Sequence, residues 1–172
     1  GTATLDPTDD NVYEGDETAT IDISSVSGKS GVTENSTQQV SVTISENESA
    51  PTVTLATSDT SIAENAGSSL TLTATLSVAT TADVTVALST SGTATEGTDY
   101  TDGSGAIDDI VISAGSTTGT VSFTPTDDSL YDATSDETAT IAISGVSGGS
   151  ASESGTQTVT ITITDNESAP TV

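Results

Sequence analysis

The chain contains no cysteine, histidine, methionine or tryptophan, and these absences exclude several kinds of functional site. Without histidine or cysteine there is no Ser-His-Asp triad, no thiolate nucleophile, and no zinc or iron–sulfur site of the usual kinds. No disulfide bond can form, so the sequence says little about the redox state of the compartment in which the protein works.

Basic residues are almost absent as well. Lys29 stands alone against 26 acidic residues, which gives a formal charge of −25 over 172 residues. Nucleic acid and anionic membranes repel such a chain, so we expect neither as a partner. No apolar run approaches the roughly 18 residues that span a bilayer, so direct membrane insertion is not expected either.

Aromatic residues are scarce, and high charge with few aromatics is usually typical of disorder. The pattern of apolar residues indicates otherwise. In residues 40–44 and 159–163, valine and isoleucine alternate with serine and threonine. This period of two is typical of half-buried strands, and no stretch has a convincing helical period.

Alternating runs separated by Gly, Asp, Asn and Ser clusters recur along the chain. They predict strands near 52–57, 69–77, 83–90, 107–113, 119–124, 137–144 and 157–164. Seven short antiparallel strands in a unit of this size predict an all-β fold, an immunoglobulin-like β-sandwich of two sheets.

Residues 1–53 and 119–172 are two copies of one segment. Asn47–Val53, for example, returns as Asn166–Val172, a shift of 119 positions. A shift this long is the size of a whole small domain, so the chain reads as tandem repeats. We expect residues 1–50 to be the C-terminal half of one repeat with its last three strands, 51–169 a complete repeat, and 170–172 the start of the next.

Half a sandwich cannot bury its apolar side, and its strands leave an unpaired edge. The missing strands of residues 1–50 belong either upstream in a longer parent chain or to another chain. In the second case the subunits would exchange strands and polymerise head to tail. The sequence leaves both arrangements open.

Many acidic residues gather where the predicted strands end. Asp9-Asp10 and Glu46 in the first copy match Asp127-Asp128 and Asp165 in the second. Clustered carboxylates repel one another unless they share a hard cation, and Ca²⁺ suits them because it takes about six to eight oxygen ligands in flexible geometry. Paired carboxylates also serve glycosidases, but here they recur once per repeat in a chain without tryptophan, so we do not expect an enzyme.

Four motifs of the complete repeat resemble the Calx-beta domain family. Gly92–Tyr100 reads GTATEGTDY, close to that family's G-T-A-x-x-G-x-D-Y signature. Ser61–Asn65 resembles its early V-x-E-N/G element, residues 127–138 its acidic stretch, and Ile161–Glu167 its closing I-x-D-D/N-D/E. The resemblance covers about residues 50–169, and residues 1–49 match only the second half of the family pattern.

The resemblance implies a seven-stranded sandwich that binds calcium at one end, near the junction with the next domain. Its implied ligands in the complete repeat are Glu64, Asp99, Asp127, Asp128, Asp132, Glu137, Asp165 and Glu167. Those in the first copy are Asp9, Asp10, Glu14, Glu17 and Glu46. The first copy has no counterparts of Glu64 and Asp99, so its set is incomplete. Asn47 and Asn166 stand where calcium-rich members carry an aspartate, which makes both sites less charged.

Together these observations favour a Ca²⁺-binding structural repeat, a spacer in a long secreted bacterial surface adhesin or filament. Calcium would stiffen the junctions between domains, and the partners would be adjacent repeats or neighbouring subunits. Two alternatives stay open. One is a self-assembling homopolymer subunit that uses residues 1–50 for strand complementation, and the other is a calcium sensor similar to the regulatory Calx-beta pair of sodium–calcium exchangers.

Overall fold

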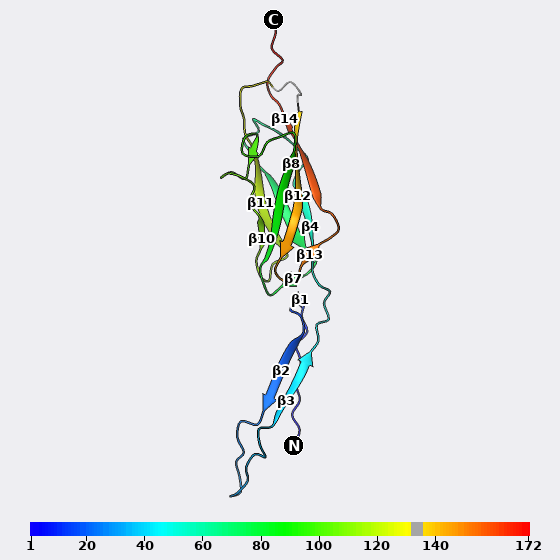
Figure 1. Cartoon of the computed structure of the whole chain (residues 1–172), viewed down its shortest axis with the longest axis vertical. Helices are drawn as coiled ribbons and strands as arrows, with labels where there is room; N and C mark the ends of the chain where they lie inside the picture. The colour runs from blue at the N-terminus through cyan, green and yellow to red at the C-terminus, as the bar shows by residue number, and fades with distance from the viewer. Residues whose placement is uncertain (132–135) are drawn as a thin grey trace.

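The computed structural model describes residues 1–131 and 136–172, and within them every regular element is a strand (Figure 1). The first segment contains β1 (Val12–Tyr13), β2 (Glu17–Asp22) and β3 (Gln39–Ile44). Seven strands of the complete repeat follow at the predicted positions, β4 (Thr52–Thr57), β6 (Leu70–Leu76), β8 (Val84–Gly92), β10 (Ile110–Ile112), β11 (Thr118–Pro125), β12 (Asp136–Ser147) and β14 (Thr158–Thr164). Between them lie the short strands β5 (Ser61–Ala63), β7 (Ala79–Thr80), β9 (Tyr100–Thr101) and β13 (Ser152–Glu153).

Two five-stranded sheets form the sandwich, one in the order β10-β8-β12-β14-β5 and the other β13-β4-β6-β11-β9. The seven strands predicted from the sequence are all present, and wherever two of them pair they run antiparallel. The predicted fold class is therefore confirmed. Parallel pairing occurs where short strands join the sheet edges, β13 on β4 and β5 on β14.

The core lies between the two sheets and follows directly from the alternation. In β6, Leu70, Leu72, Ala74 and Leu76 are buried, and the threonines between them point away. Burying each large side chain of this kind contributes about 1.5–3 kcal/mol. Phe123 adds the largest aromatic contact, because its ring stacks on Tyr100 with centroids 4.7 Å apart and an interplanar angle of 22°.

Gly92, which opens the GTATEGTDY motif, is the last residue of β8 and pairs with Ala139 of β12. A Cβ atom there would lie 2.0 Å from the Thr138 carbonyl oxygen, and the backbone φ of +127° also disfavours other residues. The amides of Thr93 and Ala94 both donate to the same oxygen, at 2.9 and 3.0 Å. Glycine is therefore required for the chain to turn tightly out of the sheet at this point.

In the first segment, β2 and β3 form an antiparallel hairpin that extends away from the sandwich (Figure 1). Residues 1–7, the counterpart of most of β11, are not in a strand. In the complete repeat β11 pairs with β6 and β9, and the first segment lacks counterparts of both. The apolar side chains Ile21, Val40 and Val42 of the hairpin are exposed, Val40 by 61%.

A short parallel pairing joins the first segment to the complete repeat. β1 lies along β7 with Val12 opposite Ala79 and Tyr13 opposite Thr80. The linker that follows the hairpin enters the sandwich through Pro51, which is fully buried. This contact was not expected from the sequence, because two-residue strands carry no periodicity.

Within the described part of the chain, no helix has the length and apolar character needed to cross a membrane.

Replacing Phe123 with alanine should lower the free energy of unfolding by about 3–5 kcal/mol, because it removes a fully buried ring and that ring's stacking contact with Tyr100. Val111→Ala is the matched control, since Val111 is 52% exposed on the outer face of β10. Urea denaturation monitored by circular dichroism measures both variants. Equal losses in the two variants would contradict a core centred on Phe123.

Candidate metal centre

Strand register brings two distant acidic residues side by side. β5 runs parallel to β14 with Ala63 opposite Thr164, so both strands end at the same place. The next residues are Glu64 and Asp165, and the Glu64 amide donates to the Thr164 carbonyl oxygen at 3.1 Å. The loop after β14 then folds back, because the Glu167 amide donates to Asp165 Oδ1 at 2.7 Å.

Three carboxylates converge at this end of the sandwich. Glu64, Asp165 and Glu167 each offer an oxygen, and these oxygens lie within 4.8 Å of one another. Calcium–oxygen bonds are about 2.3–2.6 Å long, so two oxygens on one ion lie at most about 5 Å apart. The separation of the three carboxylates is therefore compatible with one shared calcium ion.

Burial makes this cluster different from a solvated acidic surface. Glu64 is only 8% exposed. Glu64 Oε1 and Glu167 Oε2 are both buried and have no hydrogen-bond partner among the described residues. Carboxylate oxygens are acceptors only, so two of them can be joined only through a shared proton or a cation.

The electrostatics of Glu64 lead to the same conclusion. Burial, and secondly the neighbouring Glu167 carboxyl, raise the pKa of Glu64 to about 7. Above that pH the buried carboxylate is charged beside other acids, a state that a divalent cation would stabilise. An oxygen-only donor set with unpartnered buried oxygens fits Ca²⁺, and no nitrogen or sulfur ligand is needed.

Asp127 lies at the edge of this cluster. Asn166 Nδ2 donates to Asp127 Oδ1 at 3.4 Å and to Glu167 Oε1 at 3.0 Å, so the Asn166 amide connects the two acids. The backbone of Asp99 lies near Asp127, because the Asp99 carbonyl oxygen accepts from the amide of Thr126, the residue before Asp127, at 2.9 Å. Its carboxylate instead accepts from the Thr95 amide at 2.5 Å and closes its own turn.

Two further predicted ligands of the complete repeat, Asp128 and Glu137, are not among the three clustered carboxylates. Asp128 Oδ1 accepts from the Leu130 amide at 2.6 Å, in a local turn. Glu137 is half-buried on β12, opposite Ile163 of β14. Asp132 lies outside the described residues. The structure thus gathers Glu64, Asp165 and Glu167 into one cluster, with Asp127 adjacent.

The first segment reproduces the loop geometry of the complete repeat. Asn47 Nδ2 donates to Asp9 Oδ1 at 3.0 Å, as Asn166 does to Asp127. The Val12 amide donates to Asp10 Oδ1 at 2.8 Å, as Leu130 does to Asp128. The two copies therefore fold alike locally, although only one belongs to a complete sandwich.

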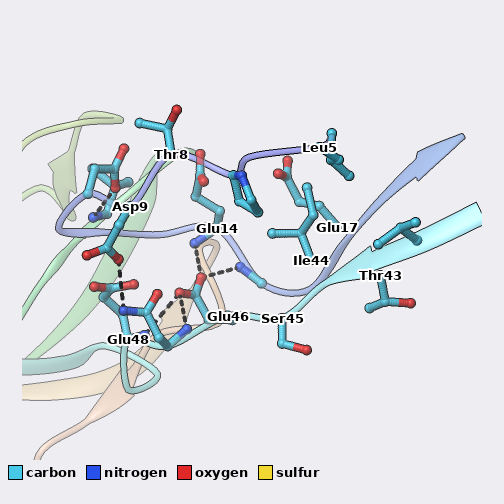
Figure 2. A pocket seen from close by; sticks show the side chains of 16 residues that line it. Leu5, Thr8, Asp9, Glu14, Glu17, Thr43, Ile44, Ser45, Glu46 and Glu48 are labelled. Atoms are coloured by element: carbon cyan, nitrogen blue, oxygen red, sulfur yellow. Dashed lines mark hydrogen bonds between the residues drawn. The ribbon is translucent and has the colours of Figure 1, made fainter. Parts of the chain in front are cut away.

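Glu46 is held differently from its counterpart Asp165. Its carboxylate accepts from four backbone amides, those of Glu14, Gly15, Asn47 and Glu48, at 2.6–3.0 Å (Figure 2). The bonds from Glu48, Glu14 and Gly15 lower the pKa of Glu46 to about 2. The carboxylate is therefore satisfied without a cation, and the segment has no counterpart of Glu64 to complete a buried cluster.

Glu46 lines a cavity of about 380 Å³ together with Asp9, Asp10, Glu14 and Glu17, so the structure brings the five predicted acids of the first copy around one space. The neighbouring charges, Glu17 first, raise the pKa of Glu14. Glu48 also lines the cavity, and it was missed as a candidate. The repeat register contained the signal, because Glu48 is the counterpart of Glu167.

The fold and the acidic strand ends define a β-sandwich module with a candidate cation site at one end. The model of the Calx-beta domain family matches residues 2–48 and 46–167. The chain belongs to the Calx-beta domain family, as its motifs indicated. No curated protein matches the chain significantly.

Two solved structures have a similar fold. The apo-form Calx CBD1 domain is 18% identical with a TM-score of 0.53, and the match covers 67% of this chain and 99% of that one. The match to CBD12 from CALX1.2, at 19% identity and a TM-score of 0.52, covers 65% of this chain and 44% of that one. Identities this low show a shared fold, and this chain spans less than half of the CBD12 structure.

Without metal, the stability contribution of Glu64 should depend on pH. Its pKa is higher in the folded protein, about 7, than the ordinary 4.5, so the folded state binds more protons between these values. The free energy of unfolding therefore falls as pH rises through this window. In the presence of a metal chelator, the Glu64→Gln variant should have a higher Tm than the unsubstituted chain, and this difference should be larger at pH 8 than at pH 5.

Thermal unfolding followed by circular dichroism measures this difference. Asp22→Asn is the matched control, because Asp22 is exposed at the end of β2 and lies outside the cluster. A Tm difference between Glu64→Gln and the unsubstituted chain that is the same at both pH values would contradict the proposed burial of a titrating Glu64.

Proposed function

We propose that this protein is a calcium-binding structural repeat, a spacer in a long extracellular surface protein, stiffened by Ca²⁺ at its domain junctions. Two observations carry the proposal: Glu64 and Glu167 each have a buried carboxylate oxygen without a hydrogen-bond partner among the described residues, and Glu64, Asp165 and Glu167 each offer a carboxylate oxygen within 4.8 Å of the others. Such a group is destabilising by itself and is stabilised by a divalent cation.

Calcium is favoured over other metals by the chemistry of the residues. The chain offers carboxylate, amide and backbone oxygens but no histidine or cysteine. Magnesium demands nearly ideal octahedral geometry and retains water, whereas calcium accepts irregular sets of carboxylates. The ion would be held by Glu64, Asp165 and Glu167. Asp127 would contribute a further oxygen at the edge of the site, because the Asn166 amide connects it to Glu167.

The proposed mechanism is electrostatic. Glu64 follows β5, whereas Asp165 and Glu167 lie in the segment through which the chain leaves the sandwich towards its C-terminal end (Figure 1). Without calcium the three carboxylates repel one another and loosen this exit. A bound ion would tie the exit segment to the body of the repeat and so restrict its direction.

An extracellular setting fits this mechanism. Calcium outside cells is millimolar, so a site of modest affinity is filled there, and a chain of charge −25 gains from neutralisation. A ligand present at a hundred times its Kd adds about 2.7 kcal/mol of stability. The chain's elongated arrangement, with its two ends on opposite sides, suits a spacer (Figure 1).

We expect calcium to raise the Tm of the purified chain relative to EGTA, with an effect equivalent to about 2.7 kcal/mol at a hundredfold excess over Kd. Magnesium should produce a much smaller rise. Glu64→Gln removes the buried charge at similar volume and should abolish most of the calcium effect. Asp22→Asn should keep it.

A calcium-induced rise that survives unchanged in Glu64→Gln would overturn this site, and no rise in the unsubstituted chain would overturn the calcium mechanism. Isothermal titration calorimetry separates the spacer from a sensor. Sub-millimolar or weaker affinity supports the spacer, whereas micromolar or tighter affinity supports a regulatory sensor of calcium.

A second candidate function is strand complementation between subunits. The hairpin of β2 and β3 exposes Ile21, Val40 and Val42, and such an apolar face with free strand edges is a template for strands of another chain.

Size-exclusion chromatography with light scattering distinguishes the two roles. Strand exchange predicts polymers whose length rises with protein concentration and falls in the variant Val40→Ser with Val42→Ser. A spacer predicts a monomer at all concentrations. A monomeric chain at high concentration would exclude the complementation model.

A further inference from the structure

The pairing of β1 with β7 is a contact between the end of one repeat and the beginning of the next. Val12 and Tyr13 come from the incomplete repeat, and Ala79 and Thr80 come from the complete one. Both residues of β7 are buried, and both residues of β1 are half-buried. We call Val12–Tyr13 the donor dipeptide and Ala79–Thr80 the acceptor dipeptide.

The complete repeat carries its own copy of the donor dipeptide, Leu130–Tyr131. The backbone that leads into it has the same turn, because Asp128 Oδ1 accepts from the Leu130 amide as Asp10 Oδ1 accepts from the Val12 amide. The surroundings differ. Leu130 is 69% exposed and Tyr131 is 38% exposed, which leaves two large apolar side chains uncovered at this end of the sandwich.

The acceptor dipeptide is held rigidly within its repeat. The Thr80 hydroxyl donates to the Ala82 carbonyl oxygen at 2.6 Å, and the Thr80 carbonyl oxygen accepts from the Gly115 amide at 2.8 Å. A Cβ atom on Gly149 would lie 2.8 Å from Thr80 Oγ1, so glycine lets this strand approach closely. The acceptor is therefore a fixed feature of the repeat.

The linker repeats as well. Pro51 and Val53, fully buried at the start of β4, have the counterparts Pro170 and Val172. The end of the complete repeat thus presents the same two elements that the first segment uses at its junction, the donor dipeptide and the Ala-Pro-Thr-Val linker.

We propose that Leu130–Tyr131 pairs in parallel with the acceptor dipeptide of a following repeat of the same kind, as Val12–Tyr13 pairs with Ala79–Thr80. This inference rests on the proposed role as a tandem spacer and names the contact that orients neighbouring repeats. The acceptor dipeptide of this chain is already covered by Val12–Tyr13. The partner is therefore the next repeat along the same chain, not a second copy of this chain.

The test compares this chain with an extended chain in which residues 1–169 are followed by a second copy of residues 51–172. Amide hydrogen exchange of Tyr131 is measured by NMR in both, because the Leu130 amide already donates to Asp128 Oδ1 in the present chain. We expect exchange at least about tenfold slower in the extended chain, because strand pairing protects amides. Tyr13 should be equally protected in both chains and serves as the internal control.

Leu130→Asp provides a matched variant. In the original chain it should leave Tm unchanged, since Leu130 is exposed there. In the extended chain it should return the exchange of Tyr131 to the rate of the original chain. Equal exchange of Tyr131 in the original and extended chains, with Tyr13 still protected, would overturn the proposal.

Performing the exchange in calcium and in EGTA separates this inference from the calcium mechanism. Protection of Tyr131 in the extended chain without any calcium-induced rise in Tm would contradict the calcium proposal and support the proposed junction. A calcium-induced rise in Tm without protection of Tyr131 would contradict the proposed junction and leave the calcium site intact.

Discussion

A carboxylate that is withdrawn from water beside other carboxylates is unstable unless something positive joins it, and Glu64 is in this position. The well-packed core around Phe123 holds β5 and β14 in parallel register, and this register fixes Glu64 next to Asp165. The backbones at Glu64 and Asp165 cannot separate without breaking this strand pairing. The stability of the sandwich therefore maintains an electrostatic arrangement that is complete only with a proton or a cation.

The duplicated segment separates what local sequence specifies from what requires the whole domain. Asp9 with Asn47 and Asp127 with Asn166 make the same hydrogen bond, so the loops fold alike in both copies. Glu46 and its counterpart Asp165 both accept from the backbone amide two residues further on. Glu46 also accepts from the amides of Glu14 and Gly15, whereas Asp165 lies in a cluster with Glu64 and Glu167. The difference is β5, which supplies Glu64 and belongs to the half that the first segment lacks. A complete repeat is therefore expected to bind the cation at this position, and a repeat without the half that contains β5 is not.

Sequence reasoning located the six strands of six or more residues in the complete repeat because alternation over that length is a strong signal, as in Leu70–Leu76. It also located the three-residue β10. It could not locate β5, β7, β9 and β13, which are two or three residues long and are placed by their neighbours. Glu64, Asp165 and Glu167 were among the predicted ligands, but their convergence depends on long-range register. Asp99 and Asp128 instead close local turns, a role that the same residue type fills equally well.

The parallel pairing of β5 with β14 also has a mechanical consequence. The chain enters the sandwich through β4 and leaves it through β14 at the opposite end (Figure 1). A pulling force applied along the molecule would act along these strands, and inter-strand hydrogen bonds lie across that direction. The bonds of β14 to β5 and β12 would then be sheared together instead of opening one after another. The repeat is therefore arranged to carry tension as a single unit.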